Sequence, residues 1–164
     1  MIHLRQILLV FSIVSGVALL PSCIFDQNGS KQKKTGLVIV NVLNKELYED
    51  CHIVGSLSVP FEQVEQYAQA HVDKDAEIVI YCSNYMCSAS GAACRKLQAL
   101  GFKNVCAYEA GTAEWYQQGL PTQGPAKSSY LNHKLEQPTH DETDICIITT
   151  QELSQKMKLE KKIE

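Results

Sequence analysis

The sequence predicts a small α/β domain with a central parallel sheet flanked by helices. Residues 37–42 and 77–81 form two nearly continuous apolar runs, as expected for strands that are covered on both faces. Apolar residues between and after these runs recur at helical spacing. Strands and helices therefore alternate along the chain, which is typical of parallel strands joined by crossover helices.

Shorter elements are expected to complete this domain. Pro60 ends one short strand, and Gly101 ends the helix that follows the second long strand. The expected elements besides the two long strands are a helix over 46–50, a strand over 57–59, a helix over 61–70, a helix from the loop 83–88 to residue 100, a strand over 105–108 and a helix over 112–118.

The overall composition fits a folded globular protein, with 45% hydrophobic and 20% charged residues. The net charge is −3, and the basic residues are dispersed apart from Lys31, Lys33 and Lys34. Because a nucleic-acid binder needs a basic surface, we expect no nucleic-acid partner. The seven cysteines are odd in number and do not repeat in spacing, which argues against a disulfide framework. Cys94 and Cys106 are expected to be small core residues.

The first 22 residues are expected to be a signal peptide of the lipoprotein type. Arg5 precedes an apolar run over residues 7–20, which is shorter than the ~20 helical residues that span a hydrocarbon core. Ser22 and Cys23 resemble the end of a bacterial lipobox, although Pro21 departs from the usual residue there. Cys23 is therefore the expected lipidation site. An uncleaved membrane anchor and an ordinary cleaved signal are the alternatives, and all three imply export.

These features predict an exported protein held by a lipid anchor in a cell membrane and facing the periplasm. Ile24 stands where some bacteria use an aspartate to retain lipoproteins in the inner membrane, so the outer membrane is favoured. Residues 23–35 are polar and are expected to form a tether between the lipid and the domain.

Cys82 lies where the chemistry of an α/β domain is usually found. It directly follows the strand over 77–81, and ligands gather at the carboxyl ends of parallel strands. The next helix begins nearby, and its unpaired N–H groups favour an anion and are expected to lower the pKa of Cys82. A buried structural cysteine is the alternative. The residues expected to form a substrate-binding loop around the thiol are Ser83, Asn84, Tyr85, Met86, Cys87 and Ser88.

Several motifs between residues 36 and 121 resemble the rhodanese family, in the order that the family has them. They are Asn41-Val42, His52-Ile53-Val54-Gly55-Ser56, Ile80-Tyr81-Cys82, Ala99-Leu100-Gly101-Phe102, Tyr108-Glu109-Ala110-Gly111, Trp115 and Gly119-Leu120-Pro121. The resemblance implies a sulfurtransferase or sulfane-sulfur carrier that forms a persulfide on Cys82. It implies a small donor such as thiosulfate or a persulfide, a thiol or cyanide acceptor, and no cofactor. It also implies that His52 braces its turn rather than acting as a base.

Cys87 departs from the rhodanese pattern, because many active relatives carry an arginine at this place. Without arginine the loop loses a bidentate contact to an oxyanion, which argues against tyrosine-phosphatase chemistry. Cys87 is a candidate second thiol that resolves an oxidised Cys82 by forming a disulfide, holds sulfur itself, or is structural. The alternatives to sulfur transfer are therefore a silent binding module and a thiol–disulfide redox module that uses Cys82 and Cys87. Paired metal-ligand spacing is missing, so no metal site is expected.

The C-terminal part of the chain suggests an additional piece of the domain. Residues 145–148 resemble a strand, and Thr149 with Glu152 forms a capping-box pattern that opens a helix up to about residue 159. Rhodanese domains normally begin with a strand and helix of this kind, which are missing before residue 36, so the resemblance implies that the extension packs on the domain. The alternatives are a second domain cut short and a frayed helix with a solvated run over residues 156–162. The expected organisation is signal peptide 1–22, tether 23–35, rhodanese-like domain 36–121, linker 122–143 and extension 144–164.

Overall fold

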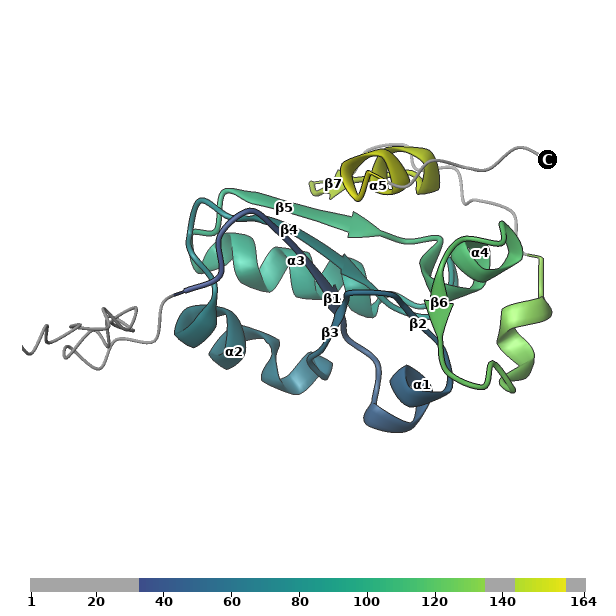
Figure 1. The fold of residues 1–164 in the computed structure, drawn as a ribbon. Coiled ribbons are helices and arrows are strands. Elements are labelled where there is room, and N and C mark those ends of the chain that lie inside the picture. Colours follow the sequence, from purple (N-terminus) through teal and green to yellow (C-terminus); the bar gives the residue numbers. More distant parts are fainter. Residues whose placement is uncertain (1–32, 135–143, 159–164) are drawn as a thin grey trace, which may run out of the picture. The chain divides into compact units, whose positions relative to one another are not determined.

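The computed structural model of the protein describes residues 33–134 and 144–158, which contain a five-stranded parallel sheet (Figure 1). The predicted α/β class is confirmed, since every neighbouring pair of strands in this sheet is parallel. The expected signal peptide, most of the tether and the lipidation site Cys23 lie outside the described residues. The strands lie in the order β3 (Leu57–Ser58), β1 (Leu37–Asn41), β4 (Glu77–Tyr81), β5 (Asn104–Tyr108) and β7 (Cys146–Ile147).

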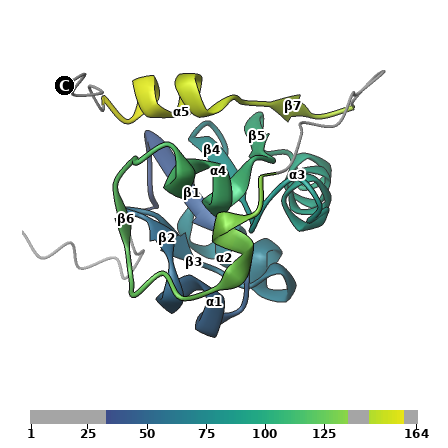
Figure 2. The same cartoon turned by 90° about the vertical axis from the view of Figure 1, so that its right-hand side faces the viewer.

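Helices cover both faces of the sheet, with α2 and α3 on one side and α5 on the other (Figures 1 and 2). Alternate strand residues point to opposite faces, so Val38 and Ile78 join one core cluster while Ile39 and Val79 join the other. Within the described ranges, no helix is long and apolar enough to cross a membrane. The helices are α1 (Lys45–Asp50), η1 (Phe61–Gln63), α2 (Val64–His71), α3 (Ala89–Ala99), α4 (Gly111–Gln117), η2 (Ser129–Asn132) and α5 (Thr150–Lys156).

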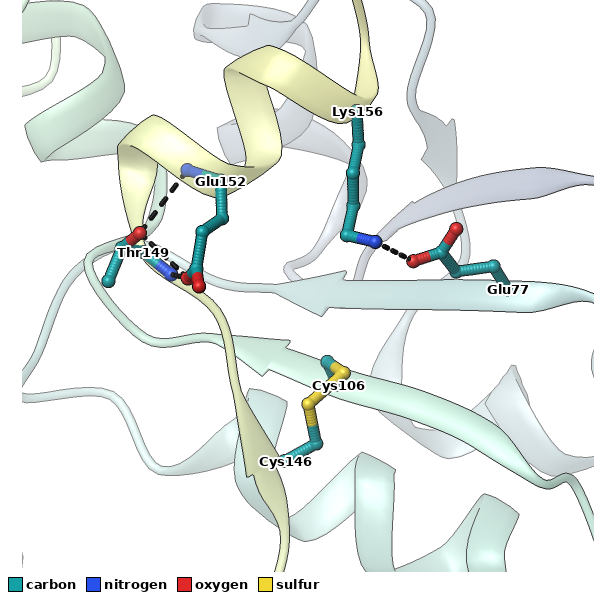
Figure 3. Close-up of a disulfide and its surroundings, with 6 residues drawn as sticks. All are labelled: Glu77, Cys106, Cys146, Thr149, Glu152 and Lys156. Atoms are coloured by element: carbon teal, nitrogen blue, oxygen red, sulfur yellow. Dashed lines mark hydrogen bonds and ion pairs between the residues drawn. A yellow bond between two sulfur atoms is a disulfide. The ribbon is translucent and has the colours of Figure 1, made fainter.

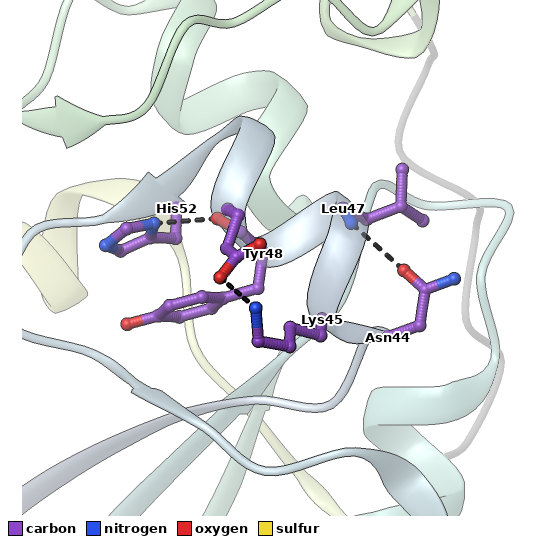
Figure 4. Close-up of polar contacts among 6 residues, drawn as sticks. Asn44, Lys45, Leu47, Tyr48 and His52 are labelled. Carbon is purple, nitrogen blue, oxygen red and sulfur yellow. Dashed lines mark hydrogen bonds and ion pairs between the residues drawn. The ribbon is translucent and has the colours of Figure 1, made fainter.

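The turn between α1 and β2 (His52–Ile53) is held by the His52 ring (Figure 4). The Nδ1 atom of His52 lies 2.7 Å from the carbonyl oxygen of Tyr48, and the two rings stack with centroids 3.9 Å apart. Helix α1 is capped at its start by Asn44, whose side-chain oxygen accepts a hydrogen bond of 3.0 Å from the N–H of Leu47. His52 therefore braces its turn, as the sequence resemblance implied.

This turn is tied to the strand that carries the candidate thiol. The N–H of Ile53 donates to the hydroxyl of Tyr81 at 3.0 Å, and the hydroxyl of Ser56 lies 2.8 Å from the same atom. Tyr81 is fully buried and is the last residue of β4, directly before Cys82. The buried phenol thus fixes the end of β4 where the loop begins.

The first part of the expected linker is folded onto the domain. Strand β6 (Thr122–Gln123) pairs antiparallel with β2, and η2 packs against α4 with Leu131 fully buried. The Asp50 carboxylate accepts hydrogen bonds of 2.9 Å from the N–H groups of Lys127 and Ser128. The linker prediction followed from a polar composition, which does not reveal these backbone contacts or the single buried leucine. Residues 135–143 lie outside the described part of the chain.

The C-terminal segment lies along the edge of the sheet. Strand β7 pairs with β5, and Cys106 and Cys146, which face each other in this register, form a disulfide (Figure 3). Cys106 is therefore not a free core residue as predicted, whereas Cys94 is a buried core thiol. The predicted capping box is confirmed, because Thr149 and Glu152 cap α5 reciprocally.

Candidate active site

Cys82 is held at the carboxyl end of β4 by the first turn of α4. Its carbonyl oxygen accepts hydrogen bonds from the N–H of Thr112 at 3.0 Å and from the hydroxyl of Thr112 at 3.2 Å. The next carbonyl, that of Ser83, accepts from the N–H of Ala113 at 2.9 Å. Gly111 allows this close approach, because a Cβ atom there would lie 2.6 Å from the Cys82 oxygen. The start of the loop is thus fixed by backbone contacts with α4.

The thiol of Cys82 faces the amino end of α3, as the sequence predicted. Its Sγ atom lies 3.4 Å from the hydroxyl of Ser90, and the N–H of Ser90 also donates toward it. The Cys87 carbonyl oxygen lies 3.1 Å from the same sulfur. Cys82 and Ser90 are both fully buried. The sulfur is therefore enclosed by polar groups of the loop and of the first turn of α3.

Cys87 is the second thiol of the site. It is half-buried, it is free, and its side chain lies within hydrogen-bonding reach of the Cys82 thiol. This shared hydrogen bond lowers the pKa of Cys87, and the N–H groups of Ala89 and Ser83 lower it further. The same shared bond, followed by burial, raises the pKa of Cys82.

The lowered pKa of the pair therefore belongs to Cys87, whereas the sequence-based expectation put it on Cys82. The difference has a physical cause. The Cys82 sulfur is shut away from water, which disfavours its charged form, while Cys87 receives two backbone N–H groups as well as the shared bond. The sequence indicates where the strand ends and where the helix starts, but it does not indicate how deeply the Cys82 side chain is buried.

The remaining loop residues form a compact turn. The side-chain oxygen of Asn84 accepts from the N–H of Met86 at 3.0 Å, and the Asn84 carbonyl accepts from the N–H of Cys87 at 3.0 Å. Met86 at the tip is 81% exposed. Ser88 precedes α3 as its cap residue but makes no side-chain capping bond. The turn brings Cys87 next to Cys82 and leaves the Met86 side chain exposed to solvent at the tip of the loop.

The loop packs on both sides of the sheet. Cys82 and Cys87 belong to the core cluster under α2 and α3, whereas Tyr85 packs against the cluster under α4 and α5. A cavity of about 410 Å³ lies beside Tyr85 and Asn84, with Glu114 in its wall. Cys82 is not among the residues that line this cavity, and its side chain is fully buried.

Glu114 is a residue of the site that sequence reasoning missed. One carboxylate oxygen accepts a hydrogen bond of 2.8 Å from the hydroxyl of Tyr85, and the other accepts from the hydroxyl of Thr150. An acid in a short helix gives no sequence signal for such a bridge, because both partners are distant in the chain. Across residues 33–134 and 144–158, no three His, Cys, Asp or Glu side chains are placed to hold a metal ion.

The fold, the strand-end cysteine and the loop that surrounds it define a rhodanese-like domain, and comparison with known proteins agrees. The profile of the rhodanese-like domain family matches residues 26–118, so the chain belongs to that family. Thiosulfate sulfurtransferase GlpE of Coxiella burnetii is 30% identical over 83 residues, which are 51% of this chain and 75% of that protein.

Two solved structures are similar to this chain. The Rhodanese_3-like domain of the Alr3790 protein from Anabaena is 28% identical with a TM-score of 0.50, and the match covers 53% of this chain and 98% of that one. The BH2092 protein of Bacillus halodurans is 26% identical with a TM-score of 0.53, and the match covers 61% and 73% of the two chains.

Proposed function

We propose that this rhodanese-like domain is a sulfurtransferase or sulfane-sulfur carrier that forms a persulfide on Cys82. The observation that carries the proposal is the position of the Cys82 sulfur, 3.4 Å from the Ser90 hydroxyl and facing the Ser90 N–H at the start of α3. Such N–H groups stabilise a negative charge, and a persulfide anion carries one. The similarity to a protein named thiosulfate sulfurtransferase supports the same chemistry.

In the proposed reaction, the sulfur of Cys82 attacks the outer sulfur of thiosulfate or of a low-molecular-weight persulfide. A bond forms between the Cys82 Sγ and that sulfur, and sulfite or a thiolate leaves. The Cys87 thiolate lies beside the Cys82 thiol and takes its proton during the attack. A thiol or cyanide acceptor then removes the outer sulfur, and Cys82 returns to its starting form.

Two features of the loop bear on the choice of donor. The Cys82 sulfur is fully buried, so residues 83–88 must open for the donor to reach it. Cys87 takes the place of the arginine found in many relatives, and an arginine would bind an oxyanion through two parallel hydrogen bonds. We therefore propose that this loop depends less on an anionic sulfonate group in its donor and favours persulfides.

Intact mass spectrometry of the reduced full chain tests the proposal. In samples quenched immediately after exposure to thiosulfate, or separately to a low-molecular-weight persulfide, Cys82 should carry sulfane sulfur that is absent in a folded Cys82→Ser variant. Cys94→Ala is the matched control, since Cys94 is a buried thiol of α3 that the reaction does not use. If neither donor modifies the folded protein, the domain is a binding or redox module instead.

We also propose that the domain works at a membrane surface, exported and anchored through a lipid on Cys23. Support comes from the sequence alone, namely Arg5, the apolar run over 7–20 and the Ser22-Cys23 pair. Cys23→Ser should move the protein from the membrane fraction to the soluble fraction. A Cys23→Ser protein that stays in the membrane fraction would contradict the lipid anchor.

A further inference from the structure

The two thiols of the loop differ in how they can be reached. Cys82 is fully buried, whereas Cys87 is half-buried and lies within hydrogen-bonding reach of the Cys82 sulfur. Neither forms a disulfide, and no other free thiol is described as a partner of either one. A simple sulfur carrier needs only one thiol, so the contact between the two calls for a chemical role.

We propose that Cys87 reduces the sulfane sulfur that Cys82 accepts, releasing it as hydrosulfide while a Cys82–Cys87 disulfide forms. This inference rests on the proposed function, since it begins from the Cys82 persulfide. It assigns to the domain an activity beyond transfer, the two-electron reduction of sulfane sulfur.

The atoms and electrons of this step balance within the loop. The sulfur of Cys87 attacks the inner sulfur of the persulfide, which is the Sγ atom of Cys82. The bond between Cys87 and Cys82 forms, the bond between the inner and outer sulfur breaks, and the outer sulfur leaves with the Cys87 proton as hydrosulfide. The outer sulfur is reduced by two electrons, and the two thiols are oxidised to a disulfide.

The geometry favours attack on the inner sulfur. The Cys82 Sγ is held in place by the Cys87 carbonyl at 3.1 Å and the Ser90 hydroxyl at 3.4 Å, and it is this atom that the Cys87 side chain contacts. The turn closed by the hydrogen bond of 3.0 Å from the Cys87 N–H to the Asn84 carbonyl keeps Cys87 over it.

The half-buried position of Cys87 also allows the disulfide to be opened again. A dithiol reductant attacks the more accessible sulfur of a disulfide, and here that sulfur belongs to Cys87. The attack releases Cys82 as a thiol, and the second thiol of the reductant then frees Cys87. The cycle therefore consumes one donor sulfur and one dithiol, and it yields hydrosulfide.

The test uses the full chain with both loop thiols reduced, thiosulfate as the sulfur donor, and no other thiol or oxygen present. Thiosulfate is chosen because its reaction with Cys82 yields sulfite, so hydrosulfide can come only from the second step. Hydrosulfide is trapped and quantified, and the peptide that holds Cys82 and Cys87 is analysed by mass. The wild type should release one equivalent of hydrosulfide per chain. Its peptide with Cys82 and Cys87 should be lighter than the reduced peptide by two hydrogens.

Two variants separate this inference from the proposed function. Cys87→Ser, or Cys87→Ala should the first fail to fold, is expected to accept sulfur on Cys82 more slowly, because it lacks the proton acceptor. After prolonged exposure it should hold the persulfide and release no hydrosulfide above the Cys82→Ser background. If the wild type retains the same stable persulfide, or carries the sulfur on Cys87, the inference is overturned while the proposed function stands. If neither the wild type nor the folded Cys87 variant releases sulfite from thiosulfate, the proposed function itself fails.

Discussion

The hydroxyl of Tyr85 donates a hydrogen bond of 2.8 Å to the carboxylate of Glu114. The same carboxylate accepts from the hydroxyl of Thr150, which also lies 2.9 Å from the hydroxyl of Tyr108 in β5. One side chain of α4 therefore connects the loop after Cys82 with the first turn of α5. The position of the loop therefore depends in part on Thr150, a residue far from Tyr85 in the sequence.

Tyr85→Phe should loosen the loop. A hydrogen bond to a charged group contributes about 1.5 kcal/mol or somewhat more to stability. The free energy of unfolding, measured in denaturant, should therefore fall by about that amount. Amide exchange of residues 83–88 should become faster. Tyr48→Phe is the control, because the Tyr48 hydroxyl donates to the Ser56 carbonyl at 2.7 Å, away from the loop. Unchanged loop exchange in Tyr85→Phe would contradict the bridge.

Gly111→Ala should abolish sulfur acceptance at Cys82. Gly111 has φ of +63°, and an added Cβ would lie 2.6 Å from backbone atoms of Cys82 and Ser83, which cannot move without shifting the loop. Gly101→Ala is matched, since Gly101 also has a positive φ of +82° but has nothing within 4 Å of the added atom. It should lose only about 1–2 kcal/mol of stability and still accept sulfur. Mass spectrometry after donor exposure compares the two variants, and full acceptance by Gly111→Ala would argue against this backbone contact.

Leu153→Ala should show how much the C-terminal helix stabilises the domain. The Leu153 side chain is fully buried in the cluster with Trp115 and Val79, and removing a buried leucine side chain costs about 2–5 kcal/mol. Gln155→Ala, on the exposed side of the same helix, should change the free energy of unfolding very little. Equal stabilities of the two variants would mean that α5 does not pack on the sheet in solution.

Removing the Cys106–Cys146 disulfide should also destabilise the domain. The two cysteines are 40 residues apart in sequence, and the chain-entropy description of a cross-link gives about 4 kcal/mol for a closed loop of this size. Unfolding of the wild type should therefore shift on addition of a reductant. The Cys106→Ser, Cys146→Ser double variant should be equally unstable with and without reductant, and a reductant effect that persists in it would point to another disulfide.

Alkylation should single out Cys87 at low pH. Its pKa is lowered, so its thiolate persists as the pH falls below about 8.5, the ordinary thiol pKa, and its reaction with iodoacetamide should continue there. Burial raises the pKa of Cys94 to about 12, so that thiol should stay unmodified. Cys82→Ala removes the largest cause of the lowered pKa and should make Cys87 react only at higher pH. Peptide mapping after brief labelling measures each site, and equal labelling of Cys94 would contradict the assignment.

Much of the fold follows from local sequence patterns. The strands β1 and β4 are continuous apolar runs, and the helix after the loop starts where the sequence indicates, so Cys82 could be placed at the sheet edge facing that helix. These features depend on neighbours in the chain, and periodicity reports them directly.

The contacts between distant segments could not be predicted in this way. The pairing of Cys106 with Cys146 depends on the register of β7 beside β5, and the role of Glu114 depends on two partners from other elements. Leu131 is a single buried residue in a polar segment, too isolated to produce a pattern. The pKa shifts of Cys82 and Cys87 depend on the hydrogen bond between the two thiols and on their burial, which only the folded loop determines.

Figure 3 shows the disulfide between Cys106 in β5 and Cys146 in β7. The stretch of chain between these two cysteines includes residues 135–143. Cutting the chain anywhere between these two strands would therefore leave two polypeptides joined by one covalent bond. Such a protein would migrate as a single species in non-reducing electrophoresis and as two fragments after reduction. The helix α5 and the residues that it contributes to the loop bridge would stay attached to the domain, so a proteolytically nicked form would behave as a two-chain protein rather than as a truncated one.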